Sequence, residues 1–189
     1  MAVVTDALEP LHPLTVEDYH RMIEAGILTE DDRVELLDGA LFEMSPEGPS
    51  HAEVVARLNR WLVRGLPDDS QIVRTGSPIT LRPLSEPQPD FAVVDASEST
   101  WHAHPERAHL LVEVSKTSLR KDRVRKARIY AEHGVPRYWI VDLVHLCVLV
   151  HTDPGPEGYG SVVTVSPPAL LDPGTCGLPP VDLGAILAA

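Results

Sequence analysis

Residues 88–114 read QPDFAVVDASESTWHAHPERAHLLVEV and place two acids beside short apolar runs. Asp90 precedes residues 91–94, and Glu113 lies within residues 110–114. Both runs are rich in β-branched residues and are flanked by proline or loop residues, which is typical of buried strands. An ionised carboxylate is costly to bury unless it is paired, protonated or bound to a metal. Two of them on neighbouring strands repel each other unless a cation or a shared proton lies between them, so the stretch predicts a cation site.

The segment after Glu113 supplies positive charge. Ser118 can cap a helix that runs to about residue 133, where Gly134 and Pro136 end it. At about 100° per residue, Lys126 falls at the edge of the apolar side, so we predict that its amine points toward the sheet and the two acids. The apolar side consists of Leu119, Val124, Ala127, Tyr130 and Ala131, and the opposite, solvent-facing side carries Lys121, Arg125 and Arg128.

Several motifs together resemble the Uma-type restriction endonuclease family, which belongs to the PD-(D/E)XK nuclease superfamily. The resemblance covers about residues 14–150, and the combination of motifs makes it specific, whereas a lone PD followed by an acid would be weak. The matching residues are Val34-Glu35-Leu36-Leu37-Asp38-Gly39, Met44-Ser45-Pro46, His51, Pro89-Asp90, Glu113-Val114-Ser115, Asp122, Lys126, Tyr130 and the run GVPRYWIVD at 134–142.

The resemblance implies an α/β fold with a restriction-endonuclease-like core, in which a mixed central β-sheet is flanked by helices. It also implies hydrolysis of phosphodiester bonds in DNA by an endonuclease that depends on Mg²⁺, with Mn²⁺ able to replace it. Asp90 and Glu113 would hold the metal with the Val114 carbonyl. Mg²⁺ suits such a site because it needs only one or two carboxylates from the protein.

The superfamily lysine, two residues after the second acid, is replaced here by Ser115. The resemblance therefore assigns the role of that lysine to Lys126, which would orient the attacking water and stabilise negative charge. Lys116 is the weaker candidate, because it points to the opposite face if the strand continues. Asp122, one turn before Lys126, is expected to orient it through an i,i+4 pair.

Glu35 lies in a predicted hairpin. Residues 33–37 and 41–44 flank Asp38-Gly39, a dipeptide typical of a two-residue hairpin turn. Alternation alone favours an outward-facing Glu35. The resemblance favours the opposite, because an acid from this region commonly joins the metal site in the superfamily, where Glu35 would bind a second ion or a metal-bound water.

His51 lies in the first turn of a predicted helix, for which Ser50 and Glu53 form an S-x-x-E capping box. Two interpretations stay open. His51 is a core histidine that donates to Ser45 or to a loop carbonyl, or it lies near the metal, is held neutral by the positive helix end, and contacts phosphate or water.

The remaining elements follow from turn residues and apolar runs. A helix capped by Thr15 and Asp18 closes at Gly26. The loop at 101–109 holds three histidines without ligand spacing, which favours a surface connection over a metal site. We predict strands over residues 71–75, 78–81, 137–142, 146–151 and 159–165.

Length and charge limit the classes of protein. A chain of 189 residues predicts one domain over residues 1–189, with a loose lead-in at 1–13 and a proline-rich C-terminal segment at 166–189. The net charge of −12 argues against broad nonspecific nucleic-acid binding but leaves a local basic surface at residues 120–128. The two cysteines suggest neither zinc nor a disulfide framework. With no signal peptide or membrane span in the sequence, we expect a cytoplasmic protein.

Three alternatives to the metal-dependent nuclease stay open. The fold is kept without catalysis as a module for binding or dimerisation, which the acidic total and Ser115 favour. The acids and Lys126 form a structural ion network. The acid pair acts as a hydrolase without metal, if the carboxyl groups are too far apart to share one ion. Cleavage of both DNA strands would suit a homodimer.

Overall fold

The computed structural model describes residues 11–29, 31–98 and 100–188, and its centre is a six-stranded mixed sheet. The strand order is β3-β4-β5-β6-β7-β8, and only β5 and β6 run parallel. The strands are β3 (Gln71–Thr75), β4 (Phe91–Asp95), β5 (Leu110–Ser115), β6 (Tyr138–Asp142), β7 (Cys147–Gly155) and β8 (Gly158–Val165). The strand predictions at 71–75, 137–142 and 159–165 are therefore confirmed within one residue, and the strand predicted at 146–151 is confirmed but continues four residues further, to Gly155.

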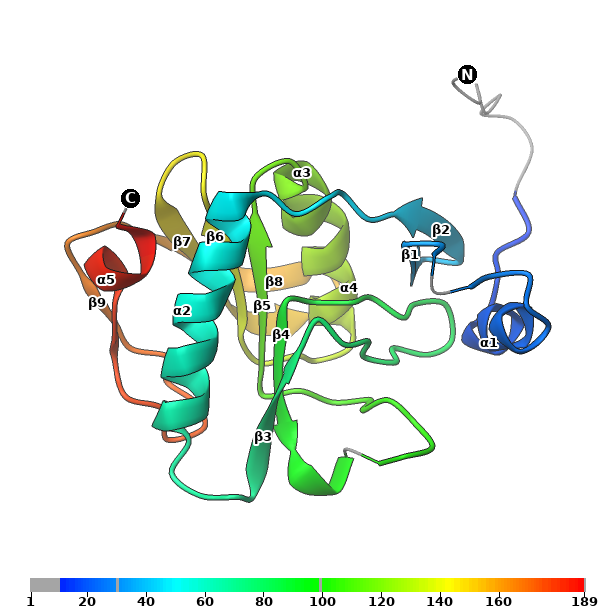
Figure 1. The fold of residues 1–189 in the computed structure, drawn as a ribbon, viewed down its shortest axis with the longest axis horizontal. Helices are drawn as coiled ribbons and strands as arrows, with labels where there is room; N and C mark the ends of the chain where they lie inside the picture. The colour runs from blue at the N-terminus through cyan, green and yellow to red at the C-terminus, as the bar shows by residue number, and fades with distance from the viewer. Residues whose placement is uncertain (1–10, 30, 99, 189) are drawn as a thin grey trace.

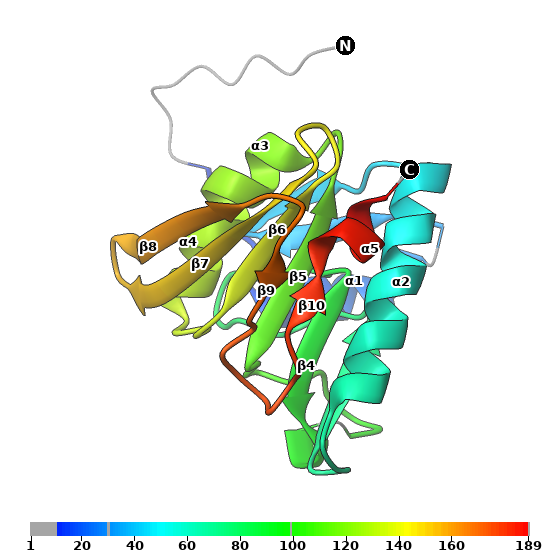
Figure 2. The same cartoon turned by 90° about the vertical axis from the view of Figure 1, so that its left-hand side faces the viewer.

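Helices cover both faces of this sheet (Figures 1 and 2). One face packs against α2 (Pro49–Gly65) and α5 (Leu183–Leu187), and the other packs against α3 (Leu119–Lys121), the π-helical turn η2 (Asp122–Lys126) and α4 (Ala127–Glu132). Alternate strand residues enter the two cores, so that Phe91 and Val112 face α2 while Ala92 and Leu111 face α4. The predicted mixed sheet flanked by helices is confirmed.

A smaller unit, which contains Glu35, lies beside the sheet at the right of Figure 1. It consists of α1 (Val16–Glu24) and the hairpin of β1 (Val34–Leu37) and β2 (Ala40–Glu43). Thr15 and Asp18 form the predicted capping box. Asp38 and Gly39 both have positive φ, at 53° and 75°, as a two-residue hairpin turn of the predicted kind requires.

Two local predictions are wrong. Residues 78–81 form no regular strand and are held by single backbone hydrogen bonds, such as Ile79 N–H to the Pro87 carbonyl. The Ser50–Glu53 capping box is absent, because α2 starts two residues earlier, with Gly48 as its N-cap. Pro49 explains the earlier start, since its fixed φ and missing N–H suit the first helical position.

The described part of the C-terminal segment packs against the α2 face of the sheet. In the C-terminal segment, β9 (Leu170–Leu171) pairs with β10 (Val181–Asp182), and α5 packs beside α2. A short η1 turn (Ala96–Glu98) follows β4. Of the lead-in predicted at 1–13, residues 1–10 lie outside the described part. Among the described residues, no helix combines the length and apolar character needed to cross a membrane.

The predicted helix at 118–133 is interrupted in the middle. The Ala127 N–H reaches the Asp122 carbonyl five residues back, which defines a π-turn between α3 and α4. The extra residue in this turn shifts the side chains around the axis relative to a regular α-helix. Val124, predicted on the apolar side, is consequently 66% exposed, and that prediction is wrong.

The hairpin turn gives the first testable prediction. At Gly39, a Cβ would lie 2.4 Å from the Pro13 Cβ and 2.9 Å from its Cα, while at Gly76, where φ is +53°, it would meet nothing within 4 Å. We expect Gly39→Ala to lower the free energy of unfolding by about 2–4 kcal/mol and Gly76→Ala by about 1 kcal/mol, because only the first adds a clash to the strained φ. Urea unfolding measures both, and equal losses would contradict the packing of the hairpin on Pro13.

Candidate active site

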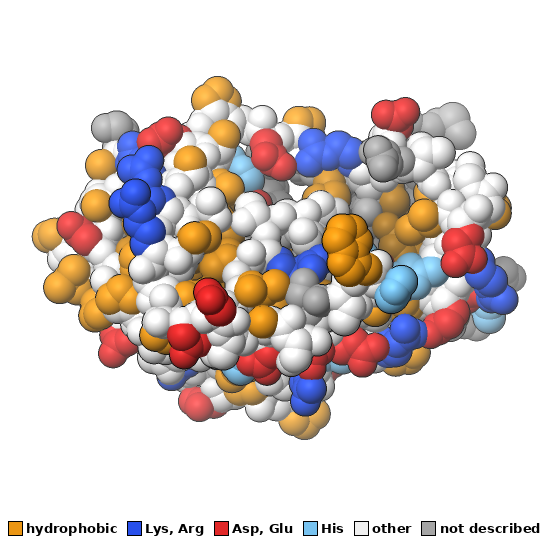
Figure 3. All heavy atoms as spheres, turned by 60° about the horizontal axis from the view of Figure 1, so that its bottom comes forward, with side chains coloured by type: hydrophobic (Ala, Val, Ile, Leu, Met, Phe, Trp, Pro, Cys, Tyr) orange, Lys and Arg blue, Asp and Glu red, His pale blue; other side chains and the backbone are white. Residues whose placement is uncertain are grey.

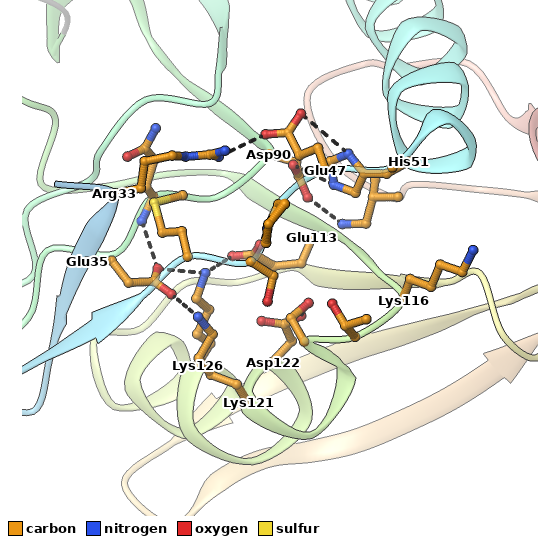
Figure 4. Close-up of a pocket in the computed structure, with 18 residues that line it drawn as sticks. Arg33, Glu35, Glu47, His51, Asp90, Glu113, Lys116, Lys121, Asp122 and Lys126 are labelled. Atoms are coloured by element: carbon orange, nitrogen blue, oxygen red, sulfur yellow. Dashed lines mark hydrogen bonds and ion pairs between the residues drawn. The ribbon is translucent and has the colours of Figure 1, made fainter. Parts of the chain in front are cut away.

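A cavity of about 300 Å³ opens where β4 begins and β5 ends. The β1–β2 hairpin, the first turn of α2 and the η2 turn surround it, as the close-up in Figure 4 shows. All five side chains singled out in the sequence line this one cavity: Glu35, His51, Asp90, Glu113 and Lys126. They come from five separate elements or loops, so that only the fold brings them together.

Asp90 and Glu113 face each other across two antiparallel strands. Phe91 pairs with Val112, which places Asp90 opposite Glu113 one step beyond this pair and on the same face of the sheet. The Asp90 Oδ2 accepts a hydrogen bond of 2.6 Å from the Val114 N–H. The two acids are therefore adjacent at the sheet end, as the sequence predicted for carboxylates on neighbouring strands.

The Glu113 carboxylate is almost fully enclosed, with 6% of the residue exposed. Its Oε1 accepts from the Lys126 ammonium at 2.9 Å and from the Tyr130 hydroxyl at 3.0 Å. Burial raises the pKa of Glu113 well above its ordinary value, although the Lys126 charge opposes the rise. Glu113 is thus a carboxylate whose charge depends on a nearby cation.

Lys126 bridges two acids inside the protein. Its Nζ lies 2.8 Å from the Glu35 Oε2 in addition to its contact with Glu113, and only 3% of the residue is exposed. Burial lowers the pKa of this lysine, but the charges of Glu113 and Glu35 outweigh it and raise the pKa above the ordinary value. The amine therefore points to the acids as the helical wheel predicted, and it is charged at neutral pH.

Glu35 faces inward, with 1% exposed, against the alternation argument and in agreement with the resemblance. Its Oε1 accepts from the Lys121 Nζ at 2.6 Å, and its Oε2 also receives the Gln88 N–H at 3.3 Å. Burial raises the pKa of Glu35, but Lys126 and Lys121 outweigh it, so the net shift is downward. Both oxygens of this ionised carboxylate are engaged by lysines.

The π-turn explains why two lysines reach one acid. Positions five apart, such as Lys121 and Lys126, are separated by about 140° on a regular α-helix, and the i,i+5 turn brings them toward the same side. The prediction that Lys121 faces solvent is therefore wrong. Sequence periodicity could not show this, because the wheel assumes a regular helix.

Asp122 is buried but does not pair with Lys126, so the predicted i,i+4 interaction is wrong. Its Oδ2 instead accepts from the Ser115 and Ser118 hydroxyls, both at 2.6 Å, and its Oδ1 has no hydrogen-bond partner among the described residues. Ser115, in the position of the superfamily lysine, thus holds the helix to the strand. Lys116 lies at the cavity rim with its amine turned away from the acids (Figure 4).

His51 is positioned by the start of α2 and points at Asp90. Its Nε2 lies 3.1 Å from the Asp90 Oδ1, and its Nδ1 lies 3.8 Å from the Glu47 Oε2. The hydrogen bond to Asp90 and the charges of Asp90 and Glu47 raise the pKa of His51, although burial opposes them. These carboxylates favour the charged form of His51, whereas the interpretation based on the helix end favoured the neutral form.

The Val114 carbonyl adds a third oxygen to the acid pair. The Leu111 N–H and the Ser115 carbonyl bond toward β6, so Val114, one residue before Ser115, directs its N–H and carbonyl toward β4. Because β4 starts only at Phe91, this carbonyl meets the cavity instead of a strand.

This donor set fits a hard divalent cation. The Glu113 Oε2 has no hydrogen-bond partner among the described residues, and it stands with Asp90 and the Val114 carbonyl as an all-oxygen set of the kind Mg²⁺ takes. The described residues contain no cluster of three or more His, Cys, Asp or Glu side chains arranged as a metal site. Glu35, occupied by the two lysines, does not join the set in this arrangement.

Comparison with known proteins identifies the class. The fold is similar to the crystal structure of a "putative nuclease belonging to DUF820" from Anabaena variabilis ATCC 29413, with a TM-score of 0.74 and 13% sequence identity, over 93% of this chain and 98% of that one. The chain therefore has a nuclease-like fold. A search of curated proteins finds no match.

The family follows from a second comparison. The model of the Uma2 family, described as "Putative restriction endonuclease", matches residues 16–176. This match covers most of the chain, so the protein belongs to the Uma2 family, and the family resemblance read from the sequence motifs is confirmed. Family and fold together support a nuclease-type function.

The bridging lysine gives the second prediction. We expect Lys126→Met to lower the free energy of unfolding by about 3–5 kcal/mol at pH 8, because it leaves Glu35 and Glu113 as buried carboxylates without their shared cation. Loss of the ammonium raises the folded pKa of both glutamates, that of Glu113 further above its ordinary value and that of Glu35 from its lowered one. The destabilisation is therefore smallest below the ordinary glutamate pKa of 4.5 and grows as the pH rises.

Urea unfolding between pH 4 and pH 8 checks this, with Lys116→Met at the exposed cavity rim as the matched control. If the two variants lost the same free energy of unfolding at every pH, Lys126 would not stabilise the charges of Glu35 and Glu113.

Proposed function

We propose that this protein is a Mg²⁺-dependent endonuclease that hydrolyses phosphodiester bonds in DNA. The observation that carries the proposal is the placement of Asp90, Glu113 and the Val114 carbonyl around one end of the sheet, with the Lys126 ammonium 2.9 Å from Glu113. Oxygen donors of this kind suit Mg²⁺, and a buried ammonium beside them suits a phosphate whose negative charge increases during reaction.

Asp90, Glu113 and the Val114 carbonyl would hold the metal ion. When bound, the ion would lower the pKa of a water molecule and polarise the phosphate. Glu113 would then be ionised, because a divalent charge beside a carboxylate opposes the effect of burial on its pKa. The Mn²⁺ ion, which takes similar oxygen ligands, is expected to substitute.

The neighbouring side chains would orient the reacting groups. Lys126, fixed between Glu113 and Glu35, can donate a hydrogen bond to the attacking water or to a phosphate oxygen. Glu35 keeps this amine charged and in place, and we keep open its role as a ligand for a second ion. His51 holds the Asp90 Oδ1, and its Nε2–H can donate to a phosphate oxygen instead.

Two copies of the site are needed to cut both strands of a duplex in one event. We therefore expect the enzyme to act on DNA as a homodimer. We also expect it to work in the cytoplasm. Size-exclusion chromatography with light scattering reports the number of copies directly.

The acid pair gives the third prediction. We expect Glu113→Gln and Asp90→Asn each to lower the rate of plasmid cleavage in Mg²⁺ by at least about 10²-fold, because each removes a charged oxygen ligand while keeping the side-chain shape. Glu53→Gln, at an exposed position on α2, serves as the control and should cut like the wild type. Cleavage by the purified Glu113→Gln protein at the wild-type rate would remove the assignment.

A module that binds without catalysis is the second candidate, and Ser115 at the superfamily lysine position favours it. Calorimetry separates the two candidates and gives the fourth prediction. After dialysis against EDTA, we expect the wild type to bind Mn²⁺ at the acid pair and Glu113→Gln to lose that binding, because a neutral amide is a weaker ligand than a carboxylate. A folded wild-type protein that takes up no Mn²⁺ would support the binding module.

A further inference from the structure

A second cavity of about 640 Å³ adjoins the first one. The two share Ser45, Thr117, Ser118 and Lys121 as lining residues, so they form one continuous depression. The second cavity, which we call the basic groove, continues between β2 and the η2–α4 segment. A ligand with one group near Asp90 and Glu113 can therefore extend past Lys121 into the basic groove.

The groove is positively charged within an acidic protein. Its lining includes Arg120, Lys121, Arg125 and Arg128 against a single acid, Glu43, while the whole chain has a net charge of −12. Arg125 and Arg128 share the Asp38 carboxylate, and Arg128 also pairs with Glu132, while Lys121 pairs with Glu35. No ion pair of Arg120 is found in the described part of the chain, and this residue is exposed. Such a surface attracts a polyanion.

The groove also presents apolar surface between these charges. Val124 is 66% exposed, and the Arg125 guanidinium lies over the Phe42 ring at 4.6 Å from its centroid. Exposed apolar groups between cations are typical of sites where unstacked bases and backbone phosphates bind together. Figure 3, which brings the bottom of Figure 1 forward, shows acidic and basic side chains mixed over that side of the molecule.

We propose that the basic groove binds a single-stranded segment of DNA next to the scissile phosphate. Arg120, Lys121 and Arg125 contact successive phosphates, and Val124 contacts a base. The volume is that of a small-ligand pocket, which a base can enter only when it is unpaired and out of the stack. This inference rests on the proposed nuclease function and specifies its substrate as DNA with an unpaired stretch at the cleavage position.

Lys121 connects the two cavities in this account. Its ammonium holds Glu35 at 2.6 Å and also lines the groove, with 21% of its side chain exposed. A phosphate that enters the groove competes with Glu35 for the Lys121 amine. Glu35 then keeps only its ion pair with Lys126. Lys121 is thus a positioning residue that links the groove to the acid cluster.

The test measures binding without cleavage and gives the fifth prediction. Fluorescence anisotropy compares a fluorescein-labelled 20-nucleotide oligothymidine with a 20-base-pair blunt duplex, in EDTA. We expect the single strand to bind at least about fivefold more tightly, and Arg120→Ala to weaken it about fivefold and reduce the salt slope by about 0.7, because one phosphate contact is lost. Val124→Glu should weaken it about tenfold, because it places a negative charge between the cations.

Arg64→Ala is the matched control, because Arg64 is an exposed arginine near the far end of α2 and about 20 Å from His51 along the helix. Circular dichroism checks that each variant is folded. Equal binding by Arg120→Ala, Val124→Glu and Arg64→Ala, a stronger binding of the duplex, or no binding of the single strand would overturn the proposal.

The two proposals fail separately. If the wild type cuts DNA in Mg²⁺ but the groove variants bind like Arg64→Ala, the groove assignment falls and the nuclease stands. If the groove variants lose single-strand binding but the wild type cuts nothing in Mg²⁺ or Mn²⁺, the groove stands and the catalytic assignment falls.

Discussion

The Lys126 ammonium, buried between Glu35 and Glu113, is the interaction on which the arrangement of the site depends. It joins the β1–β2 hairpin to β5 and to the η2 turn, which are far apart in the sequence. In a dry interior, each carboxylate needs this cation, and the cation needs at least one carboxylate. This amine contacts both the hairpin and the sheet, while Lys121 on Glu35 and the two arginines on Asp38 add further ion pairs between the hairpin and the helical segment. The same geometry leaves the Glu113 Oε2 without a hydrogen-bond partner among the described residues, at the cavity that Asp90 also lines.

The π-turn makes this arrangement possible. A regular helix would direct Lys121 and Lys126 to different sides, and Glu35 would then have one partner instead of two. The turn also directs Asp122 inward, where the hydroxyls of Ser115 and Ser118 bind it. A serine at the position of the usual superfamily lysine is thus consistent with a lysine supplied by the helix. The strand contributes a hydroxyl that anchors this helix, and the helix contributes the amine.

Short-range chemistry made several features predictable from the sequence. Asp90 and Glu113 stand beside apolar β-branched runs, so adjacent buried strands followed directly, and Asp38-Gly39 specified the hairpin turn. The features that were predicted incorrectly depend on tertiary context. Lys121 and Val124 were placed on a regular helix that the π-turn alters, and the pKa of His51 is raised chiefly by Asp90, which lies far from it in the sequence. Residues 78–81 alternate like a strand but find no continuous partner. The inward Glu35 was indicated by family motifs alone, because alternation within a four-residue strand predicted the opposite face.

The central claim is that Asp90 and Glu113 share one divalent ion while the Lys126 ammonium keeps its ion pair with Glu113. Anomalous diffraction from a crystal soaked in Mn²⁺ tests it most directly. The account predicts a single strong anomalous peak about 2.0–2.3 Å from one carboxylate oxygen of each acid and from the Val114 carbonyl, with Lys126 still bound to Glu113. An empty position between the two acids at saturating Mn²⁺, or a peak bound elsewhere on the protein, would contradict it.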